Sequence, residues 1–302
     1  GTEKKALSRH GFEIEYKESE SSKGLEKKRG FLEIQMSYNC YSRHVKVLVV
    51  ANQKGGVGKT TTTLNLAASL AATGRKILLM DIDSQANLTT GLGGKKTYEE
   101  TTITDVLLDD ASLESLIQRK PEFNFDVIPG SPDLISAELE MARVSDPTSI
   151  LKGKLNLLAH KYDYCLIDSP PSLGMLSVSA LRAADKIIIP LQCEHFSIEG
   201  LAAMQRTIIE INEATGSNLK IDGILRTMFD QEKERAREIS EKLEKSLAHQ
   251  VFSTIIPRCD LLAEAPSEGK PIMYIDPDAK GALAYFALAG EIIMKFEDKN
   301  VA

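Results

Sequence analysis

The sequence predicts one α/β domain, in which helices cover both faces of a mainly parallel sheet. The first indication is that short β-branched apolar runs alternate with longer helical segments from residue 45 to residue 296. The second is that several of these runs are apolar throughout, as is typical of strands buried on both faces. The third is that Gly74 and Gly216 stand where the glycines that end helices are expected.

The predicted elements follow one another without a detectable internal repeat. Strands are predicted in the short apolar runs, at 45–51, 76–81, 125–128, 163–168, 186–191, 219–227 and 251–256. Helices are predicted in the longer segments between and after them, at 60–73, 112–119, 133–142, 173–183, 197–214, 231–249 and 281–296.

Residues 1–44 differ in character from the predicted domain at 45–302. They carry seven Glu and nine Lys or Arg, with serines and glycines between them and little periodicity. This composition predicts a flexible polar extension, too short for a separate DNA-binding domain of ordinary size. Met36 is a candidate natural start, which would make the residues before it additions from cloning.

Composition narrows the class of protein further. The 302 residues include 42% hydrophobic ones, enough for a buried core, and this excludes wholesale disorder. The formal net charge is −6, so binding to DNA or an anionic membrane would require a local basic patch. The four cysteines, at 40, 165, 193 and 259, form no C-x-x-C pair. A cytoplasmic protein without a zinc ribbon or disulfide framework is therefore expected. No apolar run approaches the ~20 residues that a membrane span needs.

The most informative segment is a glycine-rich loop between the first predicted strand and helix. A loop that wraps polyphosphate needs glycines for converging N–H groups, a lysine for the phosphate oxygens and a hydroxyl for Mg²⁺. Gly55, Gly56, Gly58, Lys59 and Thr60 meet these needs. The strict G-x-x-x-x-G-K-[ST] pattern fails, because residue 53 is Gln in place of its first glycine, and a second lysine follows at position 54.

This loop resembles the deviant Walker A motif of the ParA/MinD group of P-loop ATPases, and ParA/Soj partition ATPases in particular. The resemblance covers nearly everything from residue 45 to residue 296. It is carried by A-N-Q-K-G-G-V-G-K-T-T at 51–61, D-I-D-S-Q-A-N-L-T at 81–89, Y-D-Y-C-L-I-D-S-P-P at 162–171 and I-P-R at 256–258 with E-A-P-S and G-K-P after it.

The resemblance implies an ATPase that uses ATP and Mg²⁺ and acts as an ATP-dependent homodimer. Lys54 would reach the partner's nucleotide, while Lys59 would hold the β/γ phosphates. Thr60 would ligate Mg²⁺, Asp168 would organise the metal shell through water, and Asp83 would position the attacking water. The residues expected to bind ATP are Lys54, Gly55, Gly56, Val57, Gly58, Lys59, Thr60 and Thr61, with Met228, Asp230 and Pro257 near the adenine.

The resemblance also implies nonspecific DNA binding, a nucleoid-associated location and a ParB-like partner that stimulates hydrolysis. Candidate DNA contacts are basic residues in or near the C-terminal motifs, namely Arg226, Arg258, Lys270 and Lys280. Leu261 stands where family members often carry an arginine, which puts DNA affinity in doubt. The mixed charges of the helix at 231–249 favour a solvated face over a DNA-binding stripe.

Three alternatives share part of this pattern. A ParA-like ATPase that positions a protein cargo over the nucleoid would share every motif. A MinD-like ATPase that cycles on membranes needs a basic amphipathic C-terminal helix, whereas residues 291–299 are acidic in part, so no stable membrane association is expected. An iron–sulfur relative would need cysteines at a dimer face, but residue 165 lies inside an apolar run.

Overall fold

The computed structural model describes residues 4–9, 12–17, 45–94, 102–109, 111–158 and 160–297. The domain is built on an eight-stranded sheet in the order β10-β9-β8-β3-β7-β4-β6-β5. Neighbouring strands are parallel except for the edge pair β5 and β6. The strands are β3 (Lys46–Val50), β4 (Ile77–Asp81), β5 (Gln118–Lys120), β6 (Phe125–Ile128), β7 (Tyr164–Asp168), β8 (Lys186–Gln192), β9 (Ile221–Phe229) and β10 (Val251–Pro257).

Helices connect most of the strands, as parallel pairing requires. The α-helices are α1 (Lys59–Ala72), α2 (Asn87–Gly91), α3 (Ile103–Leu108), α4 (Leu134–Met141), α5 (Ile150–Asn156), α6 (Met175–Ala183), α7 (Ser197–Thr215), α8 (Glu234–Leu247), α9 (Asp260–Glu264) and α10 (Lys280–Glu297). Single 3₁₀ turns are η1 (Leu113–Leu116), η2 (Pro121–Phe123), η3 (Pro147–Ser149), η4 (Ala265–Glu268) and η5 (Ile272–Tyr274).

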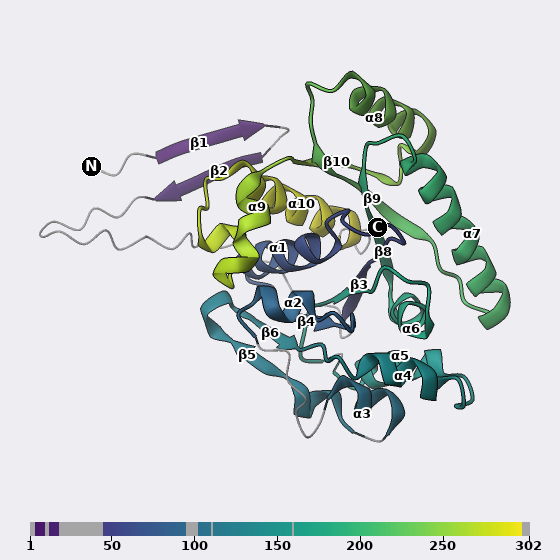
Figure 1. Cartoon of the computed structure of the whole chain (residues 1–302). Helices are drawn as coiled ribbons and strands as arrows, with labels where there is room; N and C mark the ends of the chain where they lie inside the picture. Colours follow the sequence, from purple (N-terminus) through teal and green to yellow (C-terminus); the bar gives the residue numbers. More distant parts are fainter. Residues whose placement is uncertain are drawn as a thin grey trace, which may run out of the picture.

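Two apolar layers enclose the sheet, because successive strand residues point to opposite faces. In β3, Leu48 packs into the layer with α1 and α10, whereas Val47 and Val49 pack into the layer on the other face. That second layer includes buried residues of α3 to α8. Figure 1 shows α1 and α10 together on one side of the sheet, with α6 and α7 on the other. The predicted architecture, with helices on both faces, is confirmed.

One predicted element is wrong, and several short ones escaped prediction. The helix expected at 112–119 is only the single turn η1. The backbone of Ile117 is then extended, and β5 pairs antiparallel with β6. Pairing with the edge of the sheet satisfies the backbone there in place of helical hydrogen bonds. The helices α2, α3, α5 and α9 have five to seven residues each, too few to show a clear period.

Most of the extension predicted at 1–44 lies outside the described residues. Within it, β1 (Lys4–Arg9) and β2 (Phe12–Lys17) pair as an antiparallel hairpin, which the prediction did not include. Met36 and Cys40 lie outside the described residues.

The last turn of α10 is fastened to the edge of the sheet where the parallel strands begin. Glu297 forms an ion pair with Arg75 at 2.9 Å and accepts a hydrogen bond from the Tyr164 hydroxyl at 2.5 Å. Lys46, the first residue of β3, donates to the carbonyl of Phe296. Among the described helices, none has the length and apolar character needed to cross a bilayer.

Candidate active site

The glycine-rich loop joins the carboxyl end of β3 to the amino end of α1. Gly56 and Gly58 have φ values of 74° and 87°, in the left-handed region that glycine adopts without strain. Gly58 is the N-cap of α1, so the unpaired N–H groups of the first helical turn face the loop. A helix N-terminus opened by such glycines is a ready binding site for anions. The predicted loop is therefore present with the expected geometry.

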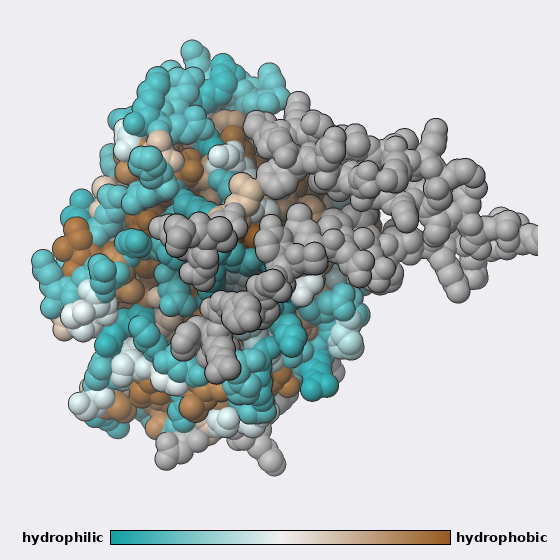
Figure 2. All heavy atoms as spheres, turned by 180° about the vertical axis from the view of Figure 1, so that it is seen from behind, coloured by the Kyte–Doolittle hydropathy of each residue, from teal (hydrophilic) through white to brown (hydrophobic). Residues whose placement is uncertain are grey.

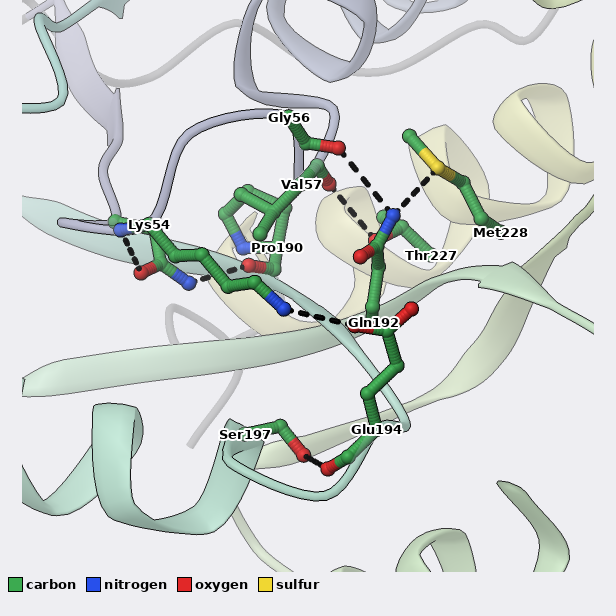
Figure 3. A network of polar contacts seen from close by, with 10 residues as sticks. Lys54, Gly56, Val57, Pro190, Gln192, Glu194, Ser197, Thr227 and Met228 are labelled. Carbon is green, nitrogen blue, oxygen red and sulfur yellow. Dashed lines mark hydrogen bonds and ion pairs between the residues drawn. The ribbon is translucent and has the colours of Figure 1, made fainter. Parts of the chain in front are cut away.

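Two neighbouring strands hold the loop in this shape. The Thr227 hydroxyl, near the end of β9, donates to the carbonyl of Val57 at 2.8 Å. The Gln192 side chain, at the end of β8, donates to the carbonyl of Gly56 at 3.3 Å (Figure 3). The loop conformation therefore depends on three strands that end at the same edge of the sheet.

Lys59 and Thr60 lie at the start of α1, facing the carboxyl end of β7. The Lys59 side chain is only 8% exposed, and its ammonium donates to the carbonyl of Lys54 at 3.2 Å. Burial lowers the pKa of Lys59, against the opposing attraction of Asp168 and Asp83. The Thr60 hydroxyl donates to Asp168 at 2.7 Å. The structure thus brings together four of the predicted site residues, namely Lys59, Thr60, Asp83 and Asp168.

Three buried carboxylates lie where β4 and β7 end side by side. Asp81 and Asp168 are opposite one another in the strand register, and Asp83 follows two residues after Asp81. Burial raises the pKa of Asp168 to about 8 and that of Asp81 to about 6, and the charge of Asp81 adds to the shift at Asp168. A cation bound at this edge of the sheet would offset the cost of ionising these buried carboxylates, so the arrangement favours one.

The donor set fits a magnesium ion that is bound together with a nucleotide. Among the described residues, no three His, Cys, Asp or Glu side chains converge as a complete metal cage. Mg²⁺ is usually held by one or two carboxylates, several waters and substrate phosphates, and does not need such a cage. The adjoining Thr60 hydroxyl and Asp168 carboxylate are suitable oxygen donors beside the phosphate loop.

The second lysine of the loop points away from the buried site. Lys54 is about half-exposed, with 46% of its side-chain surface accessible, and its ammonium pairs with Glu194 at 2.8 Å (Figure 3). Its backbone N–H donates to the Asn52 side chain, which in turn donates to the carbonyl of Pro190. The two lysines of the loop therefore differ in environment, since Lys54 lies at the surface and Lys59 is buried.

The residues predicted near the adenine lie at the carboxyl ends of β9 and β10. Met228 has a φ of 49°, unusual for a residue with a side chain, and its sulfur accepts a hydrogen bond from Gln192. A Cβ at Gly58 would lie 3.6 Å from the Met228 methyl carbon, so this side chain lies beside the phosphate loop. Asp230 caps the turn that follows, and Pro257 lies at the end of β10. Their contact with a base stays a prediction.

The prediction that Arg226 contacts DNA is wrong for this structure. Its side chain is 2% exposed, and its guanidinium donates to Ser240 at 2.7 Å and to the carbonyl of Phe252 at 2.7 Å. It also pairs with Glu244 of α8. A buried charge is costly unless it is paired and hydrogen-bonded, and these contacts meet that need. Arg226 therefore joins β9 to α8 and does not reach a phosphate outside.

The other three candidate DNA contacts are exposed. Arg258, Lys270 and Lys280 come from the segments after β10, and Leu261 lies half-buried in α9 between them. The outer face of α8 is hydrophilic (Figure 2), with acidic and basic residues interspersed and an i,i+4 pair between Lys245 and Glu241. The predicted solvated, mixed-charge face of α8 is confirmed.

Several side chains in this network escaped prediction from the sequence. Gln192 and Thr227 hold the loop, Glu194 pairs with Lys54, and Thr63 donates to Asp168 at 3.3 Å. The sequence feature that points to such residues is their position, because polar residues at the end of an apolar parallel strand gather at the edge of the sheet where ligands bind.

The described cysteines do not converge. Cys165 and Cys193 are buried and Cys259 is half-buried, and all three are free thiols. Burial raises the pKa of both Cys165 and Cys193, as expected for thiols that pack in a core. Nothing among the described residues favours the iron–sulfur alternative.

A glycine loop at a helix N-terminus, with a buried lysine and a threonine beside a strand-end aspartate, is how P-loop nucleoside triphosphatases hold their nucleotide. Comparison with known proteins narrows this class. A family model described as AAA domain matches residues 45–221.

Two relatives and one solved structure define the group more closely. The sporulation initiation inhibitor protein Soj of Bacillus subtilis is 42% identical over 247 residues, which cover 82% of this chain and 98% of Soj. The chromosome partitioning protein ParA of Myxococcus xanthus is 42% identical over 255 residues, covering 84% of this chain and 90% of ParA. Cobyrinic acid a,c-diamide synthase from Mycobacterium smegmatis, solved with an ATP analog and magnesium, aligns with a TM-score of 0.73 and 32% identity, covering 84% of this chain and 96% of the synthase.

The chain therefore belongs to the ParA/Soj family of partition ATPases. It is an ATPase whose cofactors are ATP and Mg²⁺.

Proposed function

We propose that this ATPase segregates DNA by an ATP-driven cycle of dimerisation. ATP joins two subunits face to face, the dimer binds DNA without sequence preference, and a ParB-like partner stimulates hydrolysis and release at the nucleoid. The observation that carries this proposal is the separation of the two loop lysines. Lys59 is buried beside its own phosphate loop, whereas Lys54 stands half-exposed at the rim, where a second subunit can approach it.

Each residue of the site has a role that its position supports. The Lys59 ammonium and the N–H groups of residues 55–61 bind the β/γ phosphates of the subunit's own nucleotide. Thr60 and Asp168 hold Mg²⁺, Asp168 through water, and the bound ion neutralises charge that develops on the triphosphate. Asp83 is buried to 7% exposure near these groups and orients the attacking water. Lys54 adds a cation from the partner, so hydrolysis requires the dimer.

Adenine binding and DNA binding are assigned to separate regions. Met228, Asp230 and Pro257 bind the adenine at the ends of β9 and β10, where Met228 lies beside the phosphate loop. The exposed basic residues at 258, 270 and 280 contribute phosphate contacts, which fix a protein on DNA without reading its sequence. Because contacts between basic side chains and phosphates release counterions from the DNA, DNA binding should weaken as the salt concentration rises.

A MinD-like cycle on membranes has less support. Such a cycle needs a C-terminal helix with an unpartnered apolar face. In α10, Leu288 and Ile292 are fully buried against the layer that contains α1, and the last residue, Glu297, is held by Arg75. A ParA-like ATPase that positions a protein cargo would use the same site, and identifying the stimulating partner separates that role from DNA segregation.

Filter binding to long duplex DNA at low salt tests the proposal, with ATP, ATPγS or ADP present. We expect retention with ATP or ATPγS only. Lys54→Ala should keep nucleotide binding but lose DNA retention and stimulated hydrolysis. Asp83→Ala should stay dimeric on ATP. Lys76→Ala is the matched control, because Lys76 is exposed at the opposite edge of the sheet. Equal DNA retention with ATP and with ADP would contradict the proposal. So would a Lys54→Ala variant with the same DNA retention and stimulated hydrolysis as Lys76→Ala.

A further inference from the structure

A buried carboxylate closes the loop that carries Asp83. Asp81, the last residue of β4, accepts a hydrogen bond from the backbone N–H of Asp83 at 3.1 Å. Its other oxygen accepts two bonds from Thr89 in α2, at 2.9 Å from the backbone N–H and 2.7 Å from the hydroxyl. One side chain therefore ties together the first and last parts of the segment 82–89.

The Thr89 hydroxyl both donates and accepts a hydrogen bond. It donates to Asp81 and accepts from the backbone N–H of Gly130, in the loop after β6, at 2.8 Å. Thr89 is only 4% exposed, so water does not replace either partner without local opening. The segment 82–89 is consequently fixed to β4 and to the loop after β6 at the same point.

Gly130 completes the packing around the carboxylate. A Cβ at position 130 would lie 2.8 Å from the Asp81 carboxyl carbon, closer than real contacts allow. Only a residue without a side chain lets the loop after β6 approach Asp81 so closely. The glycine and the threonine thus constrain the same carboxylate from two directions.

The local backbone needs such a constraint. Ala86, within the segment, has a φ of 47°, a conformation that costs free energy for a residue with a side chain. Asp83 and Ala86 also form a tight turn, in which the Asp83 carbonyl accepts from the Ala86 N–H at 2.8 Å. Without the contacts at both ends, this turn would relax and carry the Asp83 carboxylate with it.

We infer that Asp81, Thr89 and Gly130 form a positioning unit, defined by these three residues, that holds Asp83 in place for hydrolysis. The inference rests on the proposed role of Asp83 in orienting water. Orientation of reacting groups is sensitive to small displacements, and about 1 Å can change a rate by about 10²-fold. None of the three residues hydrogen-bonds the lysine, threonine or glycines of the phosphate loop, so loss of the unit should lower kcat and leave nucleotide affinity nearly unchanged.

The experiment uses the full chain and small side-chain changes. Thr89→Val removes the hydroxyl, Thr89→Ser retains it, and Gly130→Ala displaces Asp81 while leaving every donor in place. Thr90→Val is the matched control, since the Thr90 hydroxyl bonds only the carbonyl of Ala86, one turn back along the same helix. The readouts are kcat and KM for ATP, affinity for ATPγS, and hydrogen exchange of the Asp83 and Gly130 amides.

We expect Thr89→Val and Gly130→Ala to lower kcat by about 10- to 100-fold. KM and ATPγS affinity should stay within about threefold, and the Asp83 amide should exchange faster. Thr89→Ser and Thr90→Val should stay close to the wild type, a rescue that general destabilisation would not produce. Unchanged exchange and kcat in both Thr89→Val and Gly130→Ala would overturn the inference, as would a loss of ATPγS affinity equal to the loss of kcat.

The Asp83→Ala variant distinguishes the proposed role of Asp83 from the positioning role of Asp81, Thr89 and Gly130. If that variant hydrolyses ATP normally, the proposed role of Asp83 is wrong, whereas the exchange data still test whether the unit holds the segment. If Asp83→Ala is inactive while faster exchange in Thr89→Val leaves kcat unchanged, the positioning inference is wrong and the role of Asp83 stands.

Discussion

The ion pair between Lys54 and Glu194 gives the sharpest quantitative prediction. In the monomer this pair holds the lysine on its own subunit, at 2.8 Å from the carboxylate. If Lys54 must contact the partner's nucleotide, dimerisation has to break the pair. Glu194→Gln removes the charge while keeping the size of the side chain. We therefore expect this variant to dimerise more readily with ATP.

The magnitude follows from the exposure of the two side chains. They are 46% and 60% exposed, and ion pairs of this kind contribute about 0.2–1 kcal/mol each. Two pairs break for each dimer formed, which amounts to about 0.4–2 kcal/mol. At about 1.4 kcal/mol for each tenfold change, the dimer dissociation constant should fall by about 2- to 30-fold.

Sedimentation equilibrium with ATPγS and Mg²⁺ measures this constant, and repetition in higher salt tests its electrostatic origin. Screening should shrink the difference between variant and wild type, because the pair is exposed. Glu210→Gln on the exposed side of α7 is the matched control, since it changes the net charge equally, and Glu210 forms no ion pair with the described residues. Weaker dimerisation of Glu194→Gln than of Glu210→Gln would refute the reasoning and assign Glu194 a contact within the dimer.

Three further outcomes can be checked on the same protein. Burial raises the pKa of Asp168 to about 8, so without metal the folded protein keeps a proton that the unfolded chain loses near pH ~4. In EDTA, the free energy of unfolding should therefore fall as the pH rises from about 5 to 8. Urea titrations that show a rise over this range would contradict this. Arg226→Met should cost about 1–3 kcal/mol in urea unfolding, with Glu244 left to rehydrate, and should leave DNA binding intact; loss of DNA binding at unchanged stability would restore the DNA role. Thr227→Val removes the hydrogen bond to the carbonyl of Val57 and should weaken ATP binding about 2- to 10-fold by calorimetry, whereas equal affinity would show that β9 does not hold the loop.

The phosphate loop was predictable because its chemistry is local. Glycines, a lysine and a threonine within six residues, between an apolar run and a helical segment, already define the geometry. The strand-end aspartates were predictable for the same reason, since each directly follows or closes an apolar run. The order of the strands, by contrast, depends on which helix crosses which face, and no short pattern encodes it.

The contacts of Gln192, Glu194 and Thr227 depend on that order. They reach the loop from 136 to 170 residues away in sequence, because β8 lies next to β3 and β9 lies next to β8. Arg226 illustrates the opposite case. Its charge alone suggests a surface contact with DNA, whereas its position within an apolar strand indicates burial beside a partner on a covering helix.

The attachment of α10 has a practical consequence for imaging. Its last turn contacts the edge of the sheet where the strands begin, through Lys46, Arg75 and Tyr164. The phosphate loop lies at the opposite edge, where β3 ends. A fluorophore attached at the end of α10 would therefore lie on the side of the domain opposite the phosphate loop. Labels at that position should report the protein's movements with little obstruction of its catalytic edge.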